Sequence, residues 1–327
     1  MMIHLNRRRI LGAALCLASL VAAHASAEPA LPKQITLVVP QVAGGSNDAF
    51  GRAVASLLPK VIDADVIVDN RPGANGNIGS TYVAKSAPKD GSVWLVTVNS
   101  TQTINPVLYS KPGFDPIKDF EPVAGIATVR HLLLVNSQSK IGSMEELLSQ
   151  ARAEPGKYTY GSSGNGTFSH LLMEFMKRSQ DVQLVHVPYK GVAPALTDLI
   201  GGRITTLIST TPAAMPYIKS GHVKALAVTS LTRSANMPDV PTADETVPGM
   251  VGELTISLYA PKGTPPNVVG QMASAVNQVL DLPEMQTFAN AQGAATLRIT
   301  PQELLDLTHA DMERWAPIIK ASGMTID

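Results

Sequence analysis

Two glycine-rich loops carry the residue types from which a small-molecule site could be built. The first, residues 40–48, reads PQVAGGSND and stands between a predicted strand and a predicted helix. Such a junction presents unpaired backbone N–H groups at the positive end of the helix dipole, so it can hold a carboxylate or phosphate without a charged side chain. The loop lacks the Gly-Lys-Ser/Thr that ends a nucleotide P-loop. A tight turn with Asp48 as the helix cap is the other interpretation.

The second loop, residues 158–167, reads YTYGSSGNGT and also precedes a predicted helix. Its glycines are spaced G-x-x-G-x-G, which argues against a dinucleotide site with G-x-G-x-x-G. Ser163 is not the serine of a nucleophile elbow, because Asn165 stands where that motif needs glycine. The hydroxyls of Ser162, Ser163 and Thr167 beside free helix N–H groups favour a second anion-binding loop instead.

Two further polar and uncharged stretches follow predicted strands. Residues 99–106 come after the strand at 93–98, and residues 209–212 come after the strand at 204–208. In open α/β sheets the C-terminal ends of the strands face the ligand crevice. Four uncharged, donor-rich loops in that position predict a site for a small polar ligand that carries negative charge.

Signals for catalysis are sparse in this chain. The scattered histidines lack paired metal-ligand spacing, and we expect structural roles for His131, His170, His186 and His222. A triad of Ser163, His186 and Asp198 can be written down, but its spacing is no better than that of many other combinations. We expect no catalytic residue, no metal and no cofactor. A secreted hydrolase that acts through Ser163 is the alternative from the enzyme class.

The composition is that of a soluble globular chain long enough for about two domains. The 327 residues are 45% hydrophobic, and 26 basic residues balance 26 acidic ones. A zero formal charge argues against a general nucleic-acid binder, and a single cysteine excludes a disulfide scaffold or a cysteine-rich metal site. Trp94 and Trp315 are expected in the core.

The first 27 residues are typical of a secretory signal peptide. Arginines at 7–9 precede an apolar run at 10–23, and Ala-Ser-Ala at 25–27 supplies small residues before a cleavage point at Glu28. The run is shorter than the roughly 20 residues that span a bilayer, which disfavours a retained anchor. The basic start fits the general or the twin-arginine export route. The single cysteine, Cys16, would be removed with this segment.

Short β-rich runs alternate with amphipathic helical stretches, which predicts an α/β fold. Helices are predicted to begin at the capping signals 143–146 (SMEE) and 300–303 (TPQE), and to end near Ala153 and Ala321. Several strands are apolar throughout, as expected of strands buried on both faces. The predicted strands are residues 35–39, 66–68, 93–98, 131–135, 184–187, 204–208, 225–228 and 256–260.

Strings along the whole chain after residue 27 resemble, in order, the Bug family of tripartite tricarboxylate transporter receptors. Several of these strings are long, so chance similarity is a poor explanation. They are PQVAGGSND (40–48), DNRPGANGNIG (69–79), PKDG (88–91), INP (104–106), YGSSGNGT (160–167), HVPYKG (186–191), ALAVT (225–229), PDVPT (238–242) and APKGTP (260–265).

The resemblance implies an α/β, two-lobed periplasmic binding protein of type II, a Venus flytrap with a ligand cleft between its lobes. Residues 28–126 and 230–327 would form lobe 1 and residues 127–229 lobe 2, with two crossing strands as the hinge. The implied function is that of a periplasmic receptor, not an enzyme. We expect a monomer, because a receptor that docks on a membrane partner need not self-associate. It would deliver a small carboxylated organic anion to the membrane subunits of a tripartite tricarboxylate-type transporter. The same fold could instead serve as a ligand sensor for a signalling partner.

The resemblance also implies a set of ligand-binding positions. Family members typically hold ligand carboxylates with backbone amides, hydroxyls and ordered water instead of arginine, which agrees with the uncharged loops. We expect Asp48 to organise its loop, or to meet an ammonium group or water. The implied positions are Ala43, Gly44, Gly45, Asp48, Ser100, Thr101, Ser162, Ser163, Asn165, Gly166 and Thr167, with Tyr189 and Thr210 in addition.

The chain departs from the family pattern at Gln41 and Val42, where members commonly carry an aromatic residue followed by proline. Gln41 would replace an apolar wall with a side chain that offers one acceptor and two donors. This predicts a ligand with an additional polar group near that wall. Di- and tricarboxylates, acidic amino acids and aromatic carboxylates all remain candidates.

Overall fold

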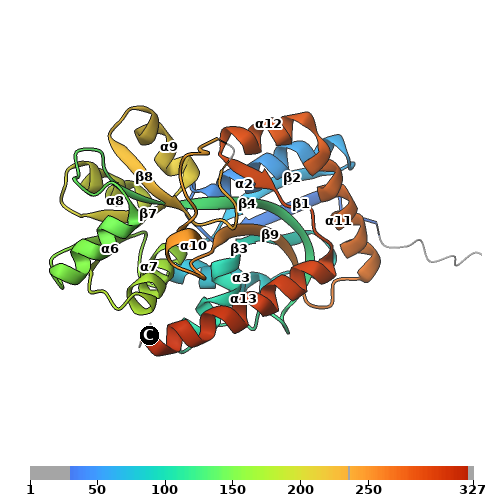
Figure 1. The fold of residues 1–327 in the computed structure, drawn as a ribbon. Helices are drawn as coiled ribbons and strands as arrows, with labels where there is room; N and C mark the ends of the chain where they lie inside the picture. The colour runs from blue at the N-terminus through green and yellow to red at the C-terminus, as the bar shows by residue number, and fades with distance from the viewer. Residues whose placement is uncertain (1–29, 235, 323–327) are drawn as a thin grey trace, which may run out of the picture. The chain divides into compact units, whose positions relative to one another are not determined.

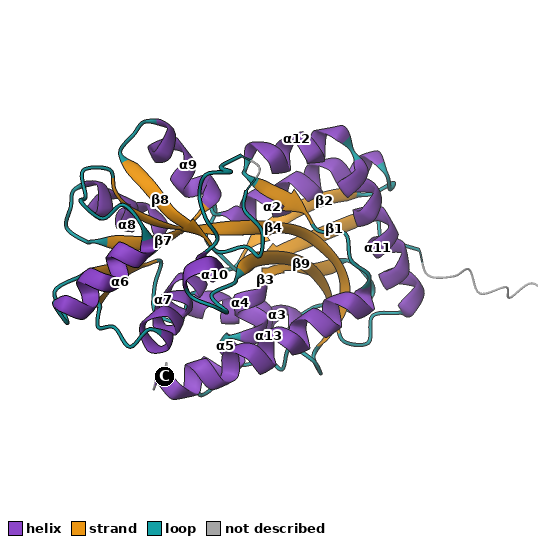
Figure 2. Cartoon of the chain, viewed as in Figure 1, coloured by secondary structure: helices purple, strands orange, loops and turns teal. Residues whose placement is uncertain are grey.

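The computed structural model describes residues 30–234 and 236–322 of the chain. The predicted signal peptide, residues 1–27, lies outside the described residues. From Leu31 onward, helices cover both faces of a ten-stranded sheet (Figures 1 and 2). The alternation of strands and helices in the sequence predicted this α/β layering, because each apolar face must be buried against another element.

The strands and helices follow one another along most of the chain. The strands are β1 (Gln34–Val39), β2 (Asp65–Asn70), β3 (Val93–Val98), β4 (Phe120–Asn136), β5 (Thr159–Ser162), β6 (Val185–Pro188), β7 (Thr206–Thr210), β8 (Val223–Val228), β9 (Glu253–Pro261) and β10 (Ala294–Thr296). The helices are α2 (Ser46–Leu57), α3 (Asn77–Ser86), α4 (Asn99–Thr103), α5 (Asn105–Leu108), α6 (Met144–Ala153), α7 (Phe168–Ser179), α8 (Val192–Ile200), α9 (Thr211–Lys219), α10 (Ala243–Thr246), α11 (Pro266–Asp281), α12 (Pro283–Ala291) and α13 (Pro301–Ser322).

The sheet mixes parallel and antiparallel pairs in the order β2-β1-β3-β9-β4-β7-β5-β6, with β8 and β10 also paired to β4. The pairs of β1 with β2 and β3 are parallel, and so are the pairs of β5 with β6 and β7. The pairs of β4 with β7, β8, β9 and β10 are antiparallel. Two groups of parallel strands therefore flank a central region built around β4.

Strand β4 belongs to both groups, and its partner changes in the middle. Through Arg130 it pairs with β9, and from His131 onward it pairs with β7 (Arg130 opposite Glu253, His131 opposite Thr210). At 17 residues, β4 is much longer than the other strands, and it crosses the molecule in Figure 1. The change of partner marks residues 130–131 as the point where the chain passes from one group to the other.

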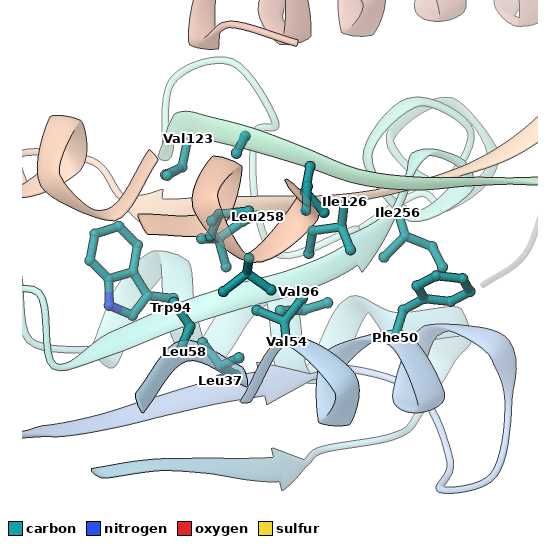
Figure 3. Packing of buried hydrophobic residues seen from close by; sticks show 14 of the residues in the cluster. Leu37, Phe50, Val54, Leu58, Trp94, Val96, Val123, Ile126, Ile256 and Leu258 are labelled. Carbon is teal, nitrogen blue, oxygen red and sulfur yellow. The ribbon is translucent and has the colours of Figure 1, made fainter. Parts of the chain in front are cut away.

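The first group of strands buries side chains on both faces because neighbouring residues of a strand point to opposite sides. Leu37 packs with Phe50 and Val54 of α2 (Figure 3), in a cluster that also contains residues of α11 and α12. Val38 faces the other way and packs with Val83 of α3, beside a residue of α13. Trp94, predicted as a core residue, is fully buried in the α2 cluster (Figure 3).

The second group repeats this arrangement with other helices. Ile208 of β7 packs in a cluster with α6 and α7, and Leu207 packs in a cluster with α8 and α9. Helix α13 reaches this group too, because Trp315 meets Phe168 of α7 edge-on with 5.2 Å between the ring centres. Trp315 is 1% exposed, which confirms the prediction that it lies in the core. Residues 243–250, around α10, contribute to the same α6–α7 cluster.

Both predicted helix starts are present. The Ser143 hydroxyl accepts from the Glu146 amide at the start of α6, although the Glu146 carboxylate binds the Gly142 amide instead of closing the reciprocal bond. At α13, Thr300 and Glu303 bond each other in both directions, which completes a capping box.

Each of the eight predicted strands overlaps a strand of the structure, but two short strands and most of β4 escaped prediction. Strand β5 reads TYGS and β10 reads AAT; both are too short to show a pattern, and each combines strand-favouring Thr or Tyr with Gly or Ala, which are depleted in strands. Both are held by their neighbours, β5 by β6 and β7, and β10 by β4. None of the helices in the described part of the chain has the length and apolar character needed to cross a bilayer.

Candidate functional site

A cavity of about 410 Å³ lies at the C-terminal ends of the parallel strands. The loops after β1, β2, β3, β5, β6 and β7 all contribute to its wall, as expected for a ligand crevice in an α/β sheet. The lining residues are Pro40, Gln41, Val42, Gly45, Ser46, Asn47, Pro72, Gly73, Asn75, Gly76, Val98, Ser100, His131, Ser163, Thr167, Phe168, Ser169, Lys190, Gly191, Val192, Thr210 and Leu254.

Four helices point their N-termini at this cavity. The residues that precede α2, α7, α8 and α9 are Gly45, Thr167, Gly191 and Thr210, and all four line the wall. In the described structure none of the four supplies a side-chain cap to its helix. The positive ends of four helix dipoles therefore converge on one volume with first-turn N–H groups available to a ligand.

The charges around the cavity also favour an anionic ligand. None of the described residues that line it is acidic, and Lys190 brings a positive charge to its edge. A negatively charged ligand would meet helix N-termini, hydroxyls and an ammonium group without an opposing carboxylate. The arrangement favours a small anion.

Asp48 organises the first loop from behind. It is 3% exposed, and its carboxylate accepts from the Gly44 amide at 2.9 Å, from Arg52 Nε at 3.0 Å and from Asn70 Nδ2 at 2.9 Å. Burial alone would raise the pKa of Asp48, but the hydrogen bonds from Arg52, Gly44 and Asn70 outweigh it and hold this pKa below its usual value. Asp48 stays ionised and shapes the loop, and it does not reach the cavity.

Gln41 lies on the wall, and its side chain links its loop to α2 and α4. Its Oε1 accepts from Asn47, whose own position is fixed by a 3.0 Å bond to the Val96 carbonyl, and its Nε2 donates to Thr101 Oγ1 at 3.2 Å. An amide nitrogen carries two hydrogens, so one Nε2 hydrogen remains for another acceptor. The polar wall predicted at Gln41 is present with its amide orientation set by Asn47 and Thr101.

The loop after β2 closes tightly against Gln41. Thr101 Oγ1 donates to the Asn75 carbonyl at 3.1 Å, and Asn105 Nδ2 donates to the same carbonyl at 2.9 Å. Gly76 has φ +95°, and a Cβ there would lie 2.9 Å from both Gln41 Nε2 and Thr101 Oγ1. Only glycine combines that backbone conformation with so close an approach.

Hydroxyl groups dominate the second loop. Ser169 Oγ accepts from the Ser163 amide at 3.1 Å and lies 3.2 Å from Ser163 Oγ and 3.0 Å from Thr167 Oγ1. Thr167 Oγ1 also donates to the Gly164 carbonyl at 2.7 Å. Three hydroxyls in contact at the start of α7 form an uncharged donor and acceptor cluster on the cavity wall.

Two stacked histidines support this loop from the side away from the cavity. Their rings are parallel within 13° and 3.9 Å apart; His186 Nε2 lies 2.7 Å from Ser162 Oγ, and His170 Nδ1 accepts from the Gly166 amide at 3.1 Å. Burial lowers the pKa of His170, and it lowers that of His186 to about 4. Both rings are neutral at pH 7, which the Gly166 bond requires because a protonated Nδ1 could not accept.

The postulated hydrolase triad is not assembled. His186 contacts Ser162, not Ser163. Asp198 accepts from the Tyr189 hydroxyl at 2.7 Å and from Arg203 at 2.7 Å, which occupies both of its carboxylate oxygens. The serine, the histidine and the aspartate therefore belong to three separate contacts.

The fourteen positions singled out from the sequence divide into two sets. Six of them line the cavity: Gln41, Gly45, Ser100, Ser163, Thr167 and Thr210. The other eight are not on its wall: Ala43, Gly44, Asp48, Thr101, Ser162, Asn165, Gly166 and Tyr189. Among these, Thr101 bonds the lining residue Gln41, and Asp48, Ser162 and Gly166 make bonds that hold the two loops behind the wall, whereas Ala43 and Asn165 are exposed to solvent.

Several lining residues were missed by reading the sequence. The loop at residues 72–76 carries the turn residues Pro, Gly and Asn after β2, and its position at a strand end could have marked it. His131, Phe168 and Leu254 come from a strand or a helix whose apolar pattern indicates only burial. Their place on the wall depends on how β4, α7 and β9 meet.

Comparison with known proteins identifies the family. The profile described as "Tripartite tricarboxylate transporter family receptor" matches residues 50–324. The chain belongs to this family of receptors.

Curated relatives cover nearly the full chain. The "UPF0065 protein in tcbD-tcbE intergenic region" of Pseudomonas sp. (strain P51) is 36% identical over 97% of this chain and 94% of its own length. Protein BugT of Bordetella pertussis is 31% identical over 93% of both chains.

Solved structures match the fold as well. R. palustris Rpa4515 with adipate has a TM-score of 0.82 at 34% identity, covering 89% of this chain and 98% of the other. MatC from Rhodopseudomonas palustris with bound malate has a TM-score of 0.78 at 29% identity, covering 88% and 98%.

Membership settles the fold class and the general role. The chain is a two-lobed α/β periplasmic binding protein, and proteins of this family are solute-binding receptors and not enzymes. Receptors of the family are periplasmic, bind small carboxylates and work with the membrane subunits of a transporter. The hydrolase alternative is therefore wrong, in agreement with the unassembled triad.

Proposed function

We propose that this protein binds a small carboxylated organic anion in the periplasm and delivers it to a tripartite tricarboxylate-type transporter. One observation carries the proposal: four helix N-termini converge on a cavity whose described lining contains no acidic side chain. A carboxylate bound there would replace water on unpaired N–H groups, which is the most favourable use of such positions. The structures solved with adipate and with malate support the choice of a carboxylate.

The ligand proposed here has an apolar segment between polar ends. Phe168, Leu254 and Val98 lie on the cavity wall together with residues of the two glycine-rich loops. A cavity of about 410 Å³ is within the ordinary range for small-molecule sites and leaves room for several carbon atoms. Dicarboxylates with a hydrocarbon chain and aromatic acids meet these requirements.

The contacts divide between direct and supporting residues. We propose that the side chains of Gln41, Ser100, Ser163, Thr167 and Thr210, together with the Gly45 backbone, touch the ligand. Ala43, Gly44, Asp48, Thr101, Ser162, Asn165, Gly166 and Tyr189 would then act by holding the loops in place or through water. Substitutions in the first set should therefore mainly lower the affinity for the ligand. Substitutions at the buried members of the second set should mainly lower the free energy of unfolding.

We further propose a hinge at residues 130–131 and the lobe boundaries 28–126 with 230–327, and 127–229. The change of partner along β4 supports the hinge, because hinge closure in binding proteins turns on a few residues in crossing segments. Residues 243–250 and the end of α13 pack with the α6–α7 cluster across this division. Removal of residues 1–27 by signal peptidase, after general or twin-arginine export, would place the chain in the periplasm.

Thermal unfolding of residues 28–327 with a panel of carboxylates tests the proposal. The panel would hold adipate, malate, hexanoate, glutamate, citrate and terephthalate, with cyclohexanol and hexylamine as uncharged and cationic controls. A ligand at 100 times its Kd adds roughly 2.7 kcal/mol to the free energy of unfolding, which raises Tm by several degrees.

The expected result is a rise with at least one carboxylate and none with the controls. Protein stripped of co-purified ligand by unfolding and refolding removes the obvious source of a false negative. No rise with any carboxylate on stripped protein would contradict the proposed ligand class.

A further inference from the structure

His131 occupies an unusual place in the cavity. Its side chain is on the wall but only 4% exposed, and it stands at the first residue of β4 that pairs with β7. Its ring packs against Phe168 with 5.2 Å between the ring centres. The Nδ1 atom is buried and has no hydrogen-bond partner among the described residues. A buried polar atom without a partner is costly, and the imidazole ring that carries it lies on the cavity wall, where a ligand group can contact the ring.

The charges near His131 do not explain this arrangement. The elements packed around His131 carry several charged or titratable groups. Among them are Arg130 on β4, Lys224 on β8, Glu253 on β9, His170, Glu174 and Lys177 on α7, Asp311 and Arg314 on α13, and Lys190 before α8. Arg130 is paired with Glu253, with 3.5 Å between Nε and Oε1. Burial is what lowers the pKa of His131, to about 4, and none of these charges contributes.

We propose that His131 forms a subsite for a second carboxylate of the ligand and that its imidazole takes up one proton from solution as that carboxylate binds. The inference rests on the proposed function and adds the ligand class, a dicarboxylate. The first carboxylate occupies the helix N-termini, and the apolar chain lies along Phe168 and Leu254. The second carboxylate reaches the imidazole at the hinge.

The uptake of a proton by His131 on ligand binding follows from the cost of burying an unpaired charge. Without ligand, the neutral imidazole avoids burying a charge, whereas a carboxylate brought into the same dry position would be left unpaired beside it. Protonation of the imidazole by a buffer acid gives an imidazolium–carboxylate pair, and the net change is the uptake of one proton and no change in covalent bonds. Bound ligand raises the pKa of His131 from about 4, so affinity must rise as the pH falls between these two pKa values.

Calorimetric titration of the wild-type protein tests this without any substitution. Adipate and malate are titrated at pH 6.5 in two buffers of different ionisation enthalpy, with hexanoate as the matched monocarboxylate. With the dicarboxylate that binds, the protein should take up close to one proton, and with hexanoate it should take up none. When the titration is repeated at lower pH, the affinity for the dicarboxylate should increase by up to about tenfold per pH unit. A dicarboxylate that binds without proton uptake overturns the inference.

His131→Gln identifies the proton acceptor, because glutamine keeps a neutral hydrogen-bonding side chain but does not titrate. The matched control is His309→Gln, which removes an exposed histidine of α13. Proton uptake should vanish in the first variant and persist in the second. Persistence in His131→Gln overturns the proposal; if that variant does not fold, the wild-type buffer comparison decides.

The same titrations separate this inference from the proposed function. If hexanoate binds as tightly as adipate and malate, or if hexanoate binds and the two dicarboxylates do not, the protein is still a carboxylate receptor but the dicarboxylate subsite is overturned. No binding of any carboxylate would overturn both.

Discussion

The two glycine-rich loops serve the same cavity but are stabilised by opposite protonation chemistry. The loop at 40–48 is held by an ionised carboxylate, Asp48, which accepts three hydrogen bonds. The loop at 162–167 is held by two neutral histidines, His170 and His186, stacked at 3.9 Å. Negative charge on the cavity wall would repel an anionic ligand, and both loops avoid it. The first loop buries its carboxylate on the side away from the cavity. The second loop is held by side chains that carry no charge.

The comparison predicts different weaknesses. The first loop depends on one residue that makes three bonds, so a single substitution should affect it strongly. The second depends on rings that must stay unprotonated, so acid should affect it first. The residues responsible, Asp48 and the two histidines, do not line the cavity, where both loops present backbone groups and small side chains.

Asp48→Asn should give the largest effect. Asparagine is of the same size, but it lacks the charge, and its amide group would face a donor in place of one acceptor oxygen. We expect a loss of about 2–3 kcal/mol in the free energy of unfolding, measured by urea denaturation, together with ligand binding weakened more than tenfold.

Asp63→Asn is the matched control, because the Asp63 side chain is 92% exposed and its ion-pair partner among residues 30–234 and 236–322 is the exposed Lys33. Its free energy of unfolding should stay within about 0.5 kcal/mol of the wild type. Equal effects of the two substitutions would show that the buried carboxylate does not organise the loop.

Acidification from pH 7 to pH 5 should affect the second loop next. Folding lowers the pKa of His170 and lowers that of His186 to about 4, below the unfolded value near 6.5, so the unfolded state binds more protons in this window. Stability from the neutral rings is therefore complete above pH 6.5 and is lost as the pH falls towards 4. The pKa of Asp48 is held low, so its carboxylate stays ionised at pH 5.

Hydrogen exchange measured by mass spectrometry, corrected for intrinsic rates, can follow the two loops separately. Protection of the amides at 163–170 should fall by about 1–2 kcal/mol, and protection at 44–50 should change less. His170→Phe keeps the ring stack but removes the acceptor for Gly166, and it should lower protection of the second loop already at pH 7. If amide protection falls equally in both loops at pH 5, the two loops do not differ in their sensitivity to acid.

Gln41→Phe should give the smallest effect of the three. The substitution removes the bonds to Asn47 and Thr101 and restores the apolar wall that is common in the family. We expect affinity for the native ligand to fall about five- to tenfold by calorimetry, which corresponds to the net contribution of one hydrogen bond.

Gln278→Phe, on the exposed side of α11, controls for a surface aromatic residue. It should leave affinity unchanged. An unchanged affinity in Gln41→Phe as well would exclude a polar contact between Gln41 and the ligand.

The strength of sequence reasoning differed between local and distant contacts. The capping box at Thr300 and the glycine loop before α2 use contacts within a few residues, and both were predictable. By contrast, β5 and β10 are short segments of mixed composition, and the strands beside them hold them in the sheet. The family resemblance added the two-lobed fold and the receptor role, which local patterns alone did not supply.

For the site, the sequence identified loops better than individual side chains. Gly45, Ser163 and Thr167 lie on the wall, but Asp48 and Ser162 from the same loops point away from it. Residue type does not reveal this, because a hydroxyl or a carboxylate can equally support a loop or face a ligand. Which role it takes depends on the partners that other strands bring to it.

By itself, the sequence determined the alternation of strands and helices, the uncharged glycine-rich junctions that favour an anion, and the charge balance that argues against a nucleic-acid binder. These properties depend on backbone preferences and on residues close together in the chain. Only the tertiary structure decided that the caps of four helices meet at one cavity, that His170 and His186 stack behind a loop, and that His131 stands where β4 changes its pairing partner. Such contacts join segments tens of residues apart, and the packing of β4 against both groups of strands brings them together.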